Sequence, residues 1–156
     1  MKTTETHNLI KEILDKLPVS YGDISINEDG SKTTWFSIEV GDPYPFLDRG
    51  GEGVFALNHL IRKITDTKSS REEANDHAII IDINGFQKKR VESVRSIAHM
   101  MAERARYFKS NIEIDPMPAF ERRVIHEFLS EAGDLKTESQ GEGHSRRVVI
   151  KYVGDL

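Results

Sequence analysis

The order of the apolar patterns in the first half of the chain constrains its fold most strongly. Residues 7–17 have helical spacing and end at Pro18, whereas 23–27 and 33–40 alternate apolar and polar residues around the turn-rich tetrapeptide 28–31. A helix followed by a β-hairpin predicts an α+β fold. In chain order we expect helix 7–17, strands 23–27 and 33–40, helix 54–64, a solvated loop over 65–76 with or without a helical tail, and the β-branched strand 78–83.

The second half continues this mixture with a longer helix. The expected elements are helix 87–110, the short strand 112–114, helix 119–132, and strands 135–139 and 147–153. Asp115 to Pro118 interrupts the chain before the second of these helices, and Gly133 ends that helix. We therefore predict two domains, 1–84 and 85–156.

Each predicted helix has an apolar stripe that we expect to be buried. The stripes are Leu9, Ile10, Ile13, Leu14 and Leu17; Val54, Leu57, Leu60, Ile61 and Ile64; Val91, Val94, Ile97, Ala98, Met101, Ala105 and Phe108; and Val124, Ile125, Phe128 and Leu129. Trp35, Phe36, Tyr44 and Phe46 are interpreted as core and sheet-face residues rather than as platforms on which bases stack.

Composition excludes several classes of site. The chain has no cysteine, which excludes disulfides, thiolate nucleophiles and Cys-ligated metal centres, and its six histidines are too scattered to suggest a metal site. We expect no cofactor and no bound metal. No apolar run reaches the roughly 18 to 20 residues that cross a bilayer, and the first residues lack the apolar core of a secretory signal. We therefore expect a cytoplasmic protein without membrane insertion.

The net charge of −4 conceals an asymmetry between the halves. Residues 1–86 carry 9 basic and 15 acidic side chains, whereas 87–156 carry 13 and 11. Seven basic and two acidic residues lie within 87–109, so the long helix is either an ordinary solvated surface or one that contacts phosphates. A nucleic-acid partner is therefore more plausible for the second half than for the first.

The strongest functional signal is the segment 116–126, PMPAFERRVIH, together with 139–150, SQGEGHSRRVVI. On a helix, Arg122 and His126 share a face because they are four residues apart. A guanidinium forks onto phosphate oxygens, and both side chains are flat enough to stack on an unpaired base. The purely structural alternative is that Arg122 pairs through solvent with a neighbouring glutamate and that a half-buried His126 donates to a backbone carbonyl.

A second cationic pair, Arg146 and Arg147, follows a glycine loop whose backbone can approach a ligand closely. Here too a structural explanation stays open, because strand alternation directs one of the two side chains inward or across to Glu138.

These two segments together resemble the R-3-H domain, named for an Arg and a His separated by three residues, in the form found in bacterial Jag (sporulation-stage-III-J-associated) proteins. The resemblance implies a small domain with helices packed on a three-stranded sheet that binds single-stranded nucleic acid. The named pair maps onto Arg122 and His126, with Arg123, Arg146 and Arg147 as neighbouring phosphate contacts. One departure is His144, where the family usually has Pro; this change either loosens the loop or adds a contact.

The first half resembles the KH segment of Jag proteins, and its element order fits a type II KH domain, for which the resemblance implies α-β-β-α-α-β. The resemblance lies in residues 46–60, FLDRGGEGVFALNHL. In KH domains a GxxG loop lets phosphates approach main-chain N–H groups at a helix N-terminus and clamps about four nucleotides. Here the loop is DRGG, with Arg49, Gly50 and Gly51 as the implied binding residues. Asp48 replaces the first glycine and would repel phosphate, so these glycines either form a weakened clamp or only a tight strand-to-helix turn.

The predicted function is therefore non-enzymatic binding of single-stranded RNA, with single-stranded DNA as the other nucleic acid, mainly through the second domain. No catalytic residues are expected, since we find no P-loop and no nucleophile beside a base. The alternative is an adaptor in cell-envelope or division control whose KH-like half binds a protein. The resemblance also implies a further small domain before the KH module, which we do not expect because the sequence begins almost at the first KH helix.

Overall fold

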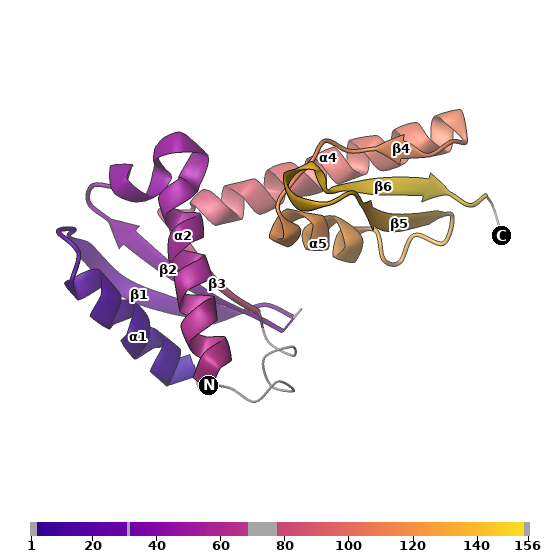
Figure 1. Cartoon of the computed structure of the whole chain (residues 1–156). Helices are drawn as coiled ribbons and strands as arrows, with labels where there is room; N and C mark the ends of the chain where they lie inside the picture. The colour runs from indigo at the N-terminus through magenta and orange to yellow at the C-terminus, as the bar shows by residue number, and fades with distance from the viewer. Residues whose placement is uncertain (1–2, 31, 69–77, 155–156) are drawn as a thin grey trace. The chain divides into compact units, whose positions relative to one another are not determined.

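The computed structural model describes residues 3–30, 32–68 and 78–154 (Figure 1). The chain divides into two compact units, Met1–Lys88 and Lys89–Leu156, called unit 1 and unit 2 below. The division falls within helix α4 (Phe86–Phe108), whereas the sequence placed the domain boundary just before this helix. Both units combine helices with a small sheet, so the predicted α+β class is confirmed.

Unit 1 contains a three-stranded sheet with two helices on one face (Figure 1). Its elements are α1 (Thr3–Asp15), β1 (Tyr21–Glu28), β2 (Thr33–Val40), α2 (Tyr44–Lys68) and β3 (Ala78–Ile83). The sheet order is β1-β2-β3, with β1 antiparallel and β3 parallel to β2. The expected strand 33–40 is confirmed at both ends and the expected strand 78–83 at its end, since the residues before Ala78 lie outside the described part. The turn residue Ser31 and most of the expected loop lie outside the described residues, and the beginning of that loop belongs to α2.

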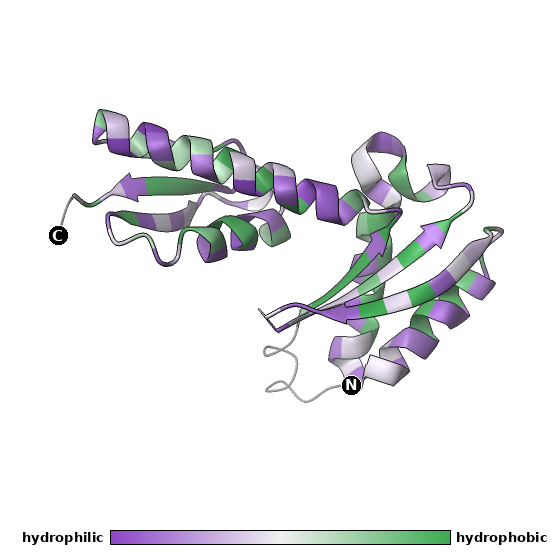
Figure 2. Ribbon diagram, turned by 180° about the vertical axis from the view of Figure 1, so that it is seen from behind, coloured by the Kyte–Doolittle hydropathy of each residue, from purple (hydrophilic) through white to green (hydrophobic). Residues whose placement is uncertain are grey.

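The core of unit 1 lies between the sheet and its two helices. Alternate strand residues face the helices, and Figure 2 shows hydrophobic residues along the strands. The fully or almost fully buried side chains include Ile10 and Leu14 of α1, Phe36 and Ile38 of β2, Val54 and Ile61 of α2, and Ile81 and Ile83 of β3. Each contributes about 1.5–3 kcal/mol to stability by leaving water.

Three expected core residues of unit 1 are exposed instead. Leu17 follows the end of α1, and Tyr44 is the first residue of α2. Leu60 lies on α2 itself, but about 100° around the helix from the centre of the buried stripe. The core expectation is thus wrong for these three side chains and holds for Phe36 and Phe46; Trp35 is half-buried.

Helix α2 is interrupted at the glycine cluster, so it is two helices separated by a sharp turn. Asp48 has an extended ψ of 153°, and Arg49, Gly50 and Gly51 have φ of 52°, 72° and 91°. With α2 counted as two helices, the observed order is the α-β-β-α-α-β order expected of a type II KH domain. The expectation of a strand-to-helix turn is wrong, because a helical segment starting at Tyr44 precedes the glycines. The sequence missed this segment because it is too short to have an apolar period.

Unit 2 also contains a three-stranded sheet, with the order β4-β6-β5 and antiparallel pairing throughout. Its elements after α4 are β4 (Ile112–Glu113), α5 (Ala119–Phe128), β5 (Leu135–Gln140), the short 3-10 helix η1 (Gly143–Ser145) and β6 (Arg147–Tyr152). The central strand β6 supplies three consecutive buried residues, Val148, Val149 and Ile150. Helices on a three-stranded sheet are what the R-3-H resemblance implied.

The buried stripe of α4 differs from the predicted one. Val91, Val94, Ala98, Ala102 and Ala105 are buried, whereas Ile97 and Phe108 are exposed. Ile97 lies about 100° around the helix from Ala98, so α4 has a buried apolar face and a second, exposed one. The predicted stripe combined residues from both faces. In α5 the prediction is wrong for Phe128, the last residue of the helix, which is exposed.

We predict that Gly51→Ala destabilises unit 1 more than Gly50→Ala. Both glycines have positive φ, which costs an L-residue about 1–2 kcal/mol. A Cβ at Gly51 would also overlap the Phe86 ring, at a further cost of about 1–3 kcal/mol, whereas a Cβ at Gly50 meets no atom within 4 Å. Urea unfolding followed by the fluorescence of Trp35, the one tryptophan of the chain, measures both free energies. Equal losses for the two variants would contradict the tight packing at Gly51.

Candidate nucleic-acid interface

Helix α5 carries the central residues of the predicted site, and its start is fixed to α4 by an ion pair. Glu121, only 5% exposed, accepts hydrogen bonds from Arg90 Nε at 3.0 Å and from Arg90 Nη2. A buried carboxylate is tolerable only when it is paired in this way. Arg90 was counted with the basic helix in the sequence, but its role as the partner of Glu121 depends on a contact across 31 positions that no local pattern reveals.

The end of α5 is fixed to the sheet by His126. One ring nitrogen lies 2.6 Å from the Thr137 hydroxyl and the other 2.8 Å from the Ser139 hydroxyl. Thr137 and Ser139 are two residues apart on β5 and therefore point to the same face of the sheet. Neither hydroxyl residue was predicted from the sequence, although the alternation of β5 was available as a signal. The structural alternative was that His126 donates to a backbone carbonyl. Instead, both ring nitrogens lie within hydrogen-bond distance of side-chain hydroxyls.

The environment of His126 favours the neutral imidazole. Burial lowers its pKa below the ordinary value, and the positive charge of Arg122 lowers the pKa further. A neutral ring donates with one nitrogen and accepts with the other, and the two hydroxyls can satisfy both roles. Because both nitrogens are occupied, His126 offers a ligand the face of its ring rather than a free N–H group.

The Arg122 side chain and the Arg146 backbone both bond Met117. Arg122 Nη1 donates to the Met117 carbonyl at 2.7 Å, and the Met117 N–H donates to the Arg146 carbonyl at 3.3 Å. Arg146 Nη1 in turn donates to the Gly141 carbonyl at 2.8 Å. Within residues 3–30, 32–68 and 78–154, neither guanidinium lies within 4.0 Å of a carboxylate. Both cations therefore keep donors and charge available for an anion.

The loop that carries Arg146 is closed by its own backbone. The Ser145 N–H donates to the Glu142 carbonyl, and the Arg146 N–H donates to the Gly143 carbonyl. His144 lies exposed in the resulting 3-10 turn, η1. At the position where the family usually has proline, this chain thus forms a hydrogen-bonded turn with an imidazole on its surface.

The structure does not bring Arg147 to the same place. Ser139 is paired with Val148 and Gln140 with Arg147, so Arg147 points to the face of the sheet opposite His126. There its Nη1 lies 3.4 Å from Glu113 Oε2. The suggested partner, Glu138, is instead paired with Lys151.

Arg123 is exposed and sits 3.7 Å from Glu127 one turn along α5. Of the five predicted cationic or aromatic contacts in unit 2, the structure groups Arg122, His126 and Arg146, leaves Arg123 beside them with a carboxylate partner, and separates Arg147. We define the first three, with Met117 between them, as the α5 surface.

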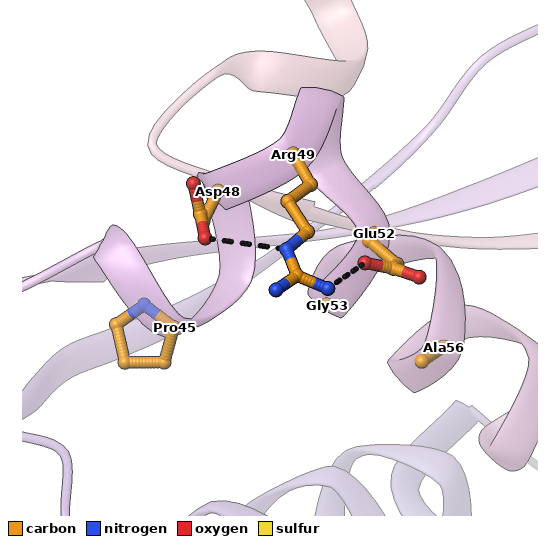
Figure 3. A pocket seen from close by; sticks show the side chains of 6 residues that line it. All are labelled: Pro45, Asp48, Arg49, Glu52, Gly53 and Ala56. Atoms are coloured by element: carbon orange, nitrogen blue, oxygen red, sulfur yellow. Dashed lines mark ion pairs between the residues drawn. The ribbon is translucent and has the colours of Figure 1, made fainter.

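The predicted clamp of unit 1 is the turn inside α2, shown in Figure 3. Arg49 lies 3.9 Å from Asp48 and 3.9 Å from Glu52, and all three line a hollow of about 310 Å³ together with Pro45, Gly53 and Ala56. Arg49 and Gly50 are exposed, and Gly51 is buried against Phe86. The turn therefore offers one cation between two carboxylates, which is a weak attraction for phosphate.

Other ligand classes find less support in the described part of the chain. No group of three or more His, Asp or Glu side chains there is arranged to hold a metal ion. No described helix is both long and apolar enough to span a bilayer.

Comparison with known proteins assigns the second unit to a family. The family description that matches the chain is the R-3-H domain, over residues 92–152. Residues 92–152 form an R-3-H domain. The matched range begins within α4 and ends with β6, so it contains the whole α5 surface.

Relatives that match more of the chain extend the similarity beyond the R-3-H domain. RNA-binding protein KhpB of Bacillus subtilis (strain 168) is 28% identical over 132 residues, which are 83% of this chain and 61% of that protein. The proteins of the same name from Clostridium symbiosum and Streptococcus pneumoniae serotype 2 are 23% and 24% identical over 90% and 94% of this chain. The chain spans about three fifths of the length of the first two relatives. The Jag resemblance is confirmed, while the KH assignment of residues 1–84 stays a prediction.

We predict that unit 2 loses stability as the pH falls below neutrality because of His126. Its pKa is lower in the folded state than the unfolded value of about 6.5, so the unfolded chain binds more protons between these two values. Stability is therefore full above the unfolded pKa and decreases as the pH falls toward the folded pKa. The variant His126→Gln has no imidazole to titrate. Between pH 7.5 and 5.5, each roughly one unit from the unfolded pKa, its calorimetric unfolding temperature should fall less than that of the wild type. A ring that titrates above about 6.5 in an NMR pH series would contradict this assignment.

Proposed function

We propose that the chain is a non-enzymatic RNA-binding protein whose α5 surface contacts single-stranded RNA. The observation that carries the proposal is that two guanidinium groups bond backbone carbonyls, Arg122 that of Met117 and Arg146 that of Gly141, without a carboxylate partner in the described residues. Guanidinium groups fork onto phosphate oxygens, and half or more of the hydrogen bonds in nucleic-acid interfaces go to the backbone of the nucleic acid.

His126 has a different part in this proposal. Its two nitrogens are occupied by Thr137 and Ser139, so it holds α5 on the sheet and presents a flat ring beside Arg122. Stacking of a base on such a ring is tolerant of sequence. The residue that binds phosphate most directly is therefore Arg122, with Arg146 second.

The comparisons support RNA as the ligand. The matching relatives are named RNA-binding proteins, and the matching domain is the R-3-H domain. Phosphate contact and stacking alone do not distinguish ribose from deoxyribose, since only a contact to the 2′-hydroxyl does so. Parallel titrations with single-stranded RNA and DNA of one sequence measure this preference.

We predict that Arg122→Ala and Arg146→Ala each weaken RNA binding about tenfold at moderate salt. A charge-assisted hydrogen bond contributes about 1.5–3 kcal/mol, and each lost phosphate contact should reduce the slope of log affinity against log salt by about 0.7. Fluorescence anisotropy with a labelled single-stranded oligoribonucleotide across a salt series measures both quantities. The double variant Arg122→Ala with His126→Ala should bind more weakly than either single arginine variant.

Arg147→Ala is the matched control, because Arg147 carries the same charge on the opposite face of the sheet. Its salt slope should stay close to that of the wild type. If Arg147→Ala and Arg122→Ala weaken binding equally, the contact is only a general attraction to basic residues, and the α5 surface is not the site.

A second candidate function is an adaptor whose unit 1 binds a protein. It is favoured by the acidic surplus of residues 1–86 and by the position of Arg49 between Asp48 and Glu52. In this arrangement the KH-like turn keeps its backbone shape, but its charges no longer favour phosphate. The two functions are compatible, because they use different units.

We predict that Asp48→Gly and Glu52→Gln each strengthen RNA binding about fivefold. Each change removes one carboxylate beside Arg49, and a repulsion of about 1 kcal/mol near the surface corresponds to this factor. Asp23→Asn, an exposed change of the same charge on β1, controls for net charge. No gain for either variant at any salt concentration would mean that the turn is purely structural.

A further inference from the structure

The last turn of α4 presents two aromatic rings to solvent. Tyr107 is 82% exposed and Phe108 is 60% exposed, and their rings pack edge to face with centroids 5.0 Å apart. Neither ring belongs to the buried stripe of the helix, and the α5 surface uses neither of them. Exposing two large rings side by side is costly in water, which suggests a ligand for them.

Two cations lie on either side of these rings along the chain. Arg104 lies three and four residues before Tyr107 and Phe108 and therefore shares their face of the helix. Lys109 follows directly, and both cations are exposed. We call Arg104, Tyr107, Phe108 and Lys109 the aromatic end of α4. Rings with adjacent cations are the combination by which proteins hold single-stranded nucleic acid without reading its sequence.

The helix end is held in one conformation by its backbone. The Lys109 N–H donates to the Arg106 carbonyl and the Ser110 N–H to the Ala105 carbonyl, and Lys109 has a φ of 48°. These are the two hydrogen bonds of a Schellman ending, with lysine in the position that glycine usually takes. The ending occupies two of the last carbonyl groups, and it fixes the backbone on which both rings stand. The rings are therefore preorganised for a ligand.

The aromatic end is also anchored beside the strand that leads to the α5 surface. Arg106 Nε and Nη2 donate to the two carboxylate oxygens of Asp134 at 2.6 and 3.0 Å, and Asp134 directly precedes β5. Thr137, which binds His126, is three residues farther along, or roughly 10 Å at the rise of a strand. Strand β5 thus connects the anchor of the aromatic end with the residue that holds His126.

We propose that the aromatic end of α4 is a second subsite for single-stranded RNA, at which bases stack on Tyr107 and Phe108 while Arg104 and Lys109 attract the backbone. The proposal rests on the proposed function and extends it to a second contact on unit 2. The partial negative charge at a helix C-terminus disfavours phosphate, so base stacking is the main contact here and the two cations offset the dipole.

A protein helix is the less favourable occupant. The exposed apolar face of α4 continues from Phe108 back to Met100 and Ile97, but Arg104 lies in its middle. An apolar partner would have to bury this guanidinium, which is costly without a paired carboxylate. A second copy of the chain would place its own basic helix against this one, and like charges disfavour that contact.

The test measures the affinity of the full chain for fluorescein-labelled oligouridylates of about 5 and about 15 nucleotides, lengths near the two ends of known single-strand site sizes. Tyr107→Leu combined with Phe108→Leu keeps apolar area and removes both rings. We expect the affinity for the longer oligonucleotide to fall about 25-fold or more, since stacking on each of the two rings contributes about fivefold or more per base. The short oligonucleotide, which can be held at the α5 surface alone, should lose much less.

Two controls make the result specific. Met100→Ala removes exposed apolar surface from the same face without removing a ring, and Tyr107→Phe keeps the ring; both should bind the longer oligonucleotide like the wild type. Unchanged affinity of the Leu double variant overturns the subsite, and the proposed function survives this result if Arg122→Ala still weakens binding. A loss for the Leu double variant with none for Arg122→Ala would instead overturn the α5 surface and support the aromatic end. A dimer in sedimentation equilibrium that the Leu double variant dissolves, at unchanged RNA affinity, would identify the face as an interface between copies and overturn the proposal.

Discussion

The position of α5 on the second sheet decides which basic side chains of this chain can act together. Two interactions fix that position: the buried Glu121 is paired with Arg90 at the start of the helix, and His126 is bonded to two hydroxyls of β5 near its end. A carboxylate that is 5% exposed strongly disfavours any arrangement in which its arginine is absent. The helix is therefore held at both ends, and Arg122, which lies between them, has little freedom except in its own side chain.

The same sheet separates cations that are available from cations that are already neutralised. On the face opposite α5, two of the three cations of β5 and β6 are neutralised, because Arg147 is paired with Glu113 and Lys151 with Glu138, while Lys136 lies across from Lys151. On the α5 side, Arg122 and Arg146 bond only backbone carbonyls among the contacts described for them. The pairing of charges, rather than their number, makes one face suitable for phosphate.

The sequence predicted the elements better than the contacts between them. Strand 33–40 was located at both ends and strand 78–83 at its end, because alternation and β-branched residues are local signals. Ile97 and Phe108 were wrongly placed in the core because α4 has a second, exposed apolar face, and periodicity does not tell which face is covered. The different directions of Arg146 and Arg147 could not be predicted from the sequence. They depend on the pairing of Ser139 with Val148, which is a register set by the fold.

The turn inside α2 combines a strained backbone with opposing charges. Arg49 adopts a left-handed conformation that costs an L-residue about 1–2 kcal/mol, and glycine would adopt it freely. Its guanidinium lies 3.9 Å from Asp48 and 3.9 Å from Glu52, so both carboxylates favour the conformation that brings them to it. Such exposed pairs are weak, contributing about 0.2–1 kcal/mol, and offset only part of that strain. The acidic residues that would repel a phosphate thus also support the turn, which explains how its left-handed backbone persists beside a poor phosphate site.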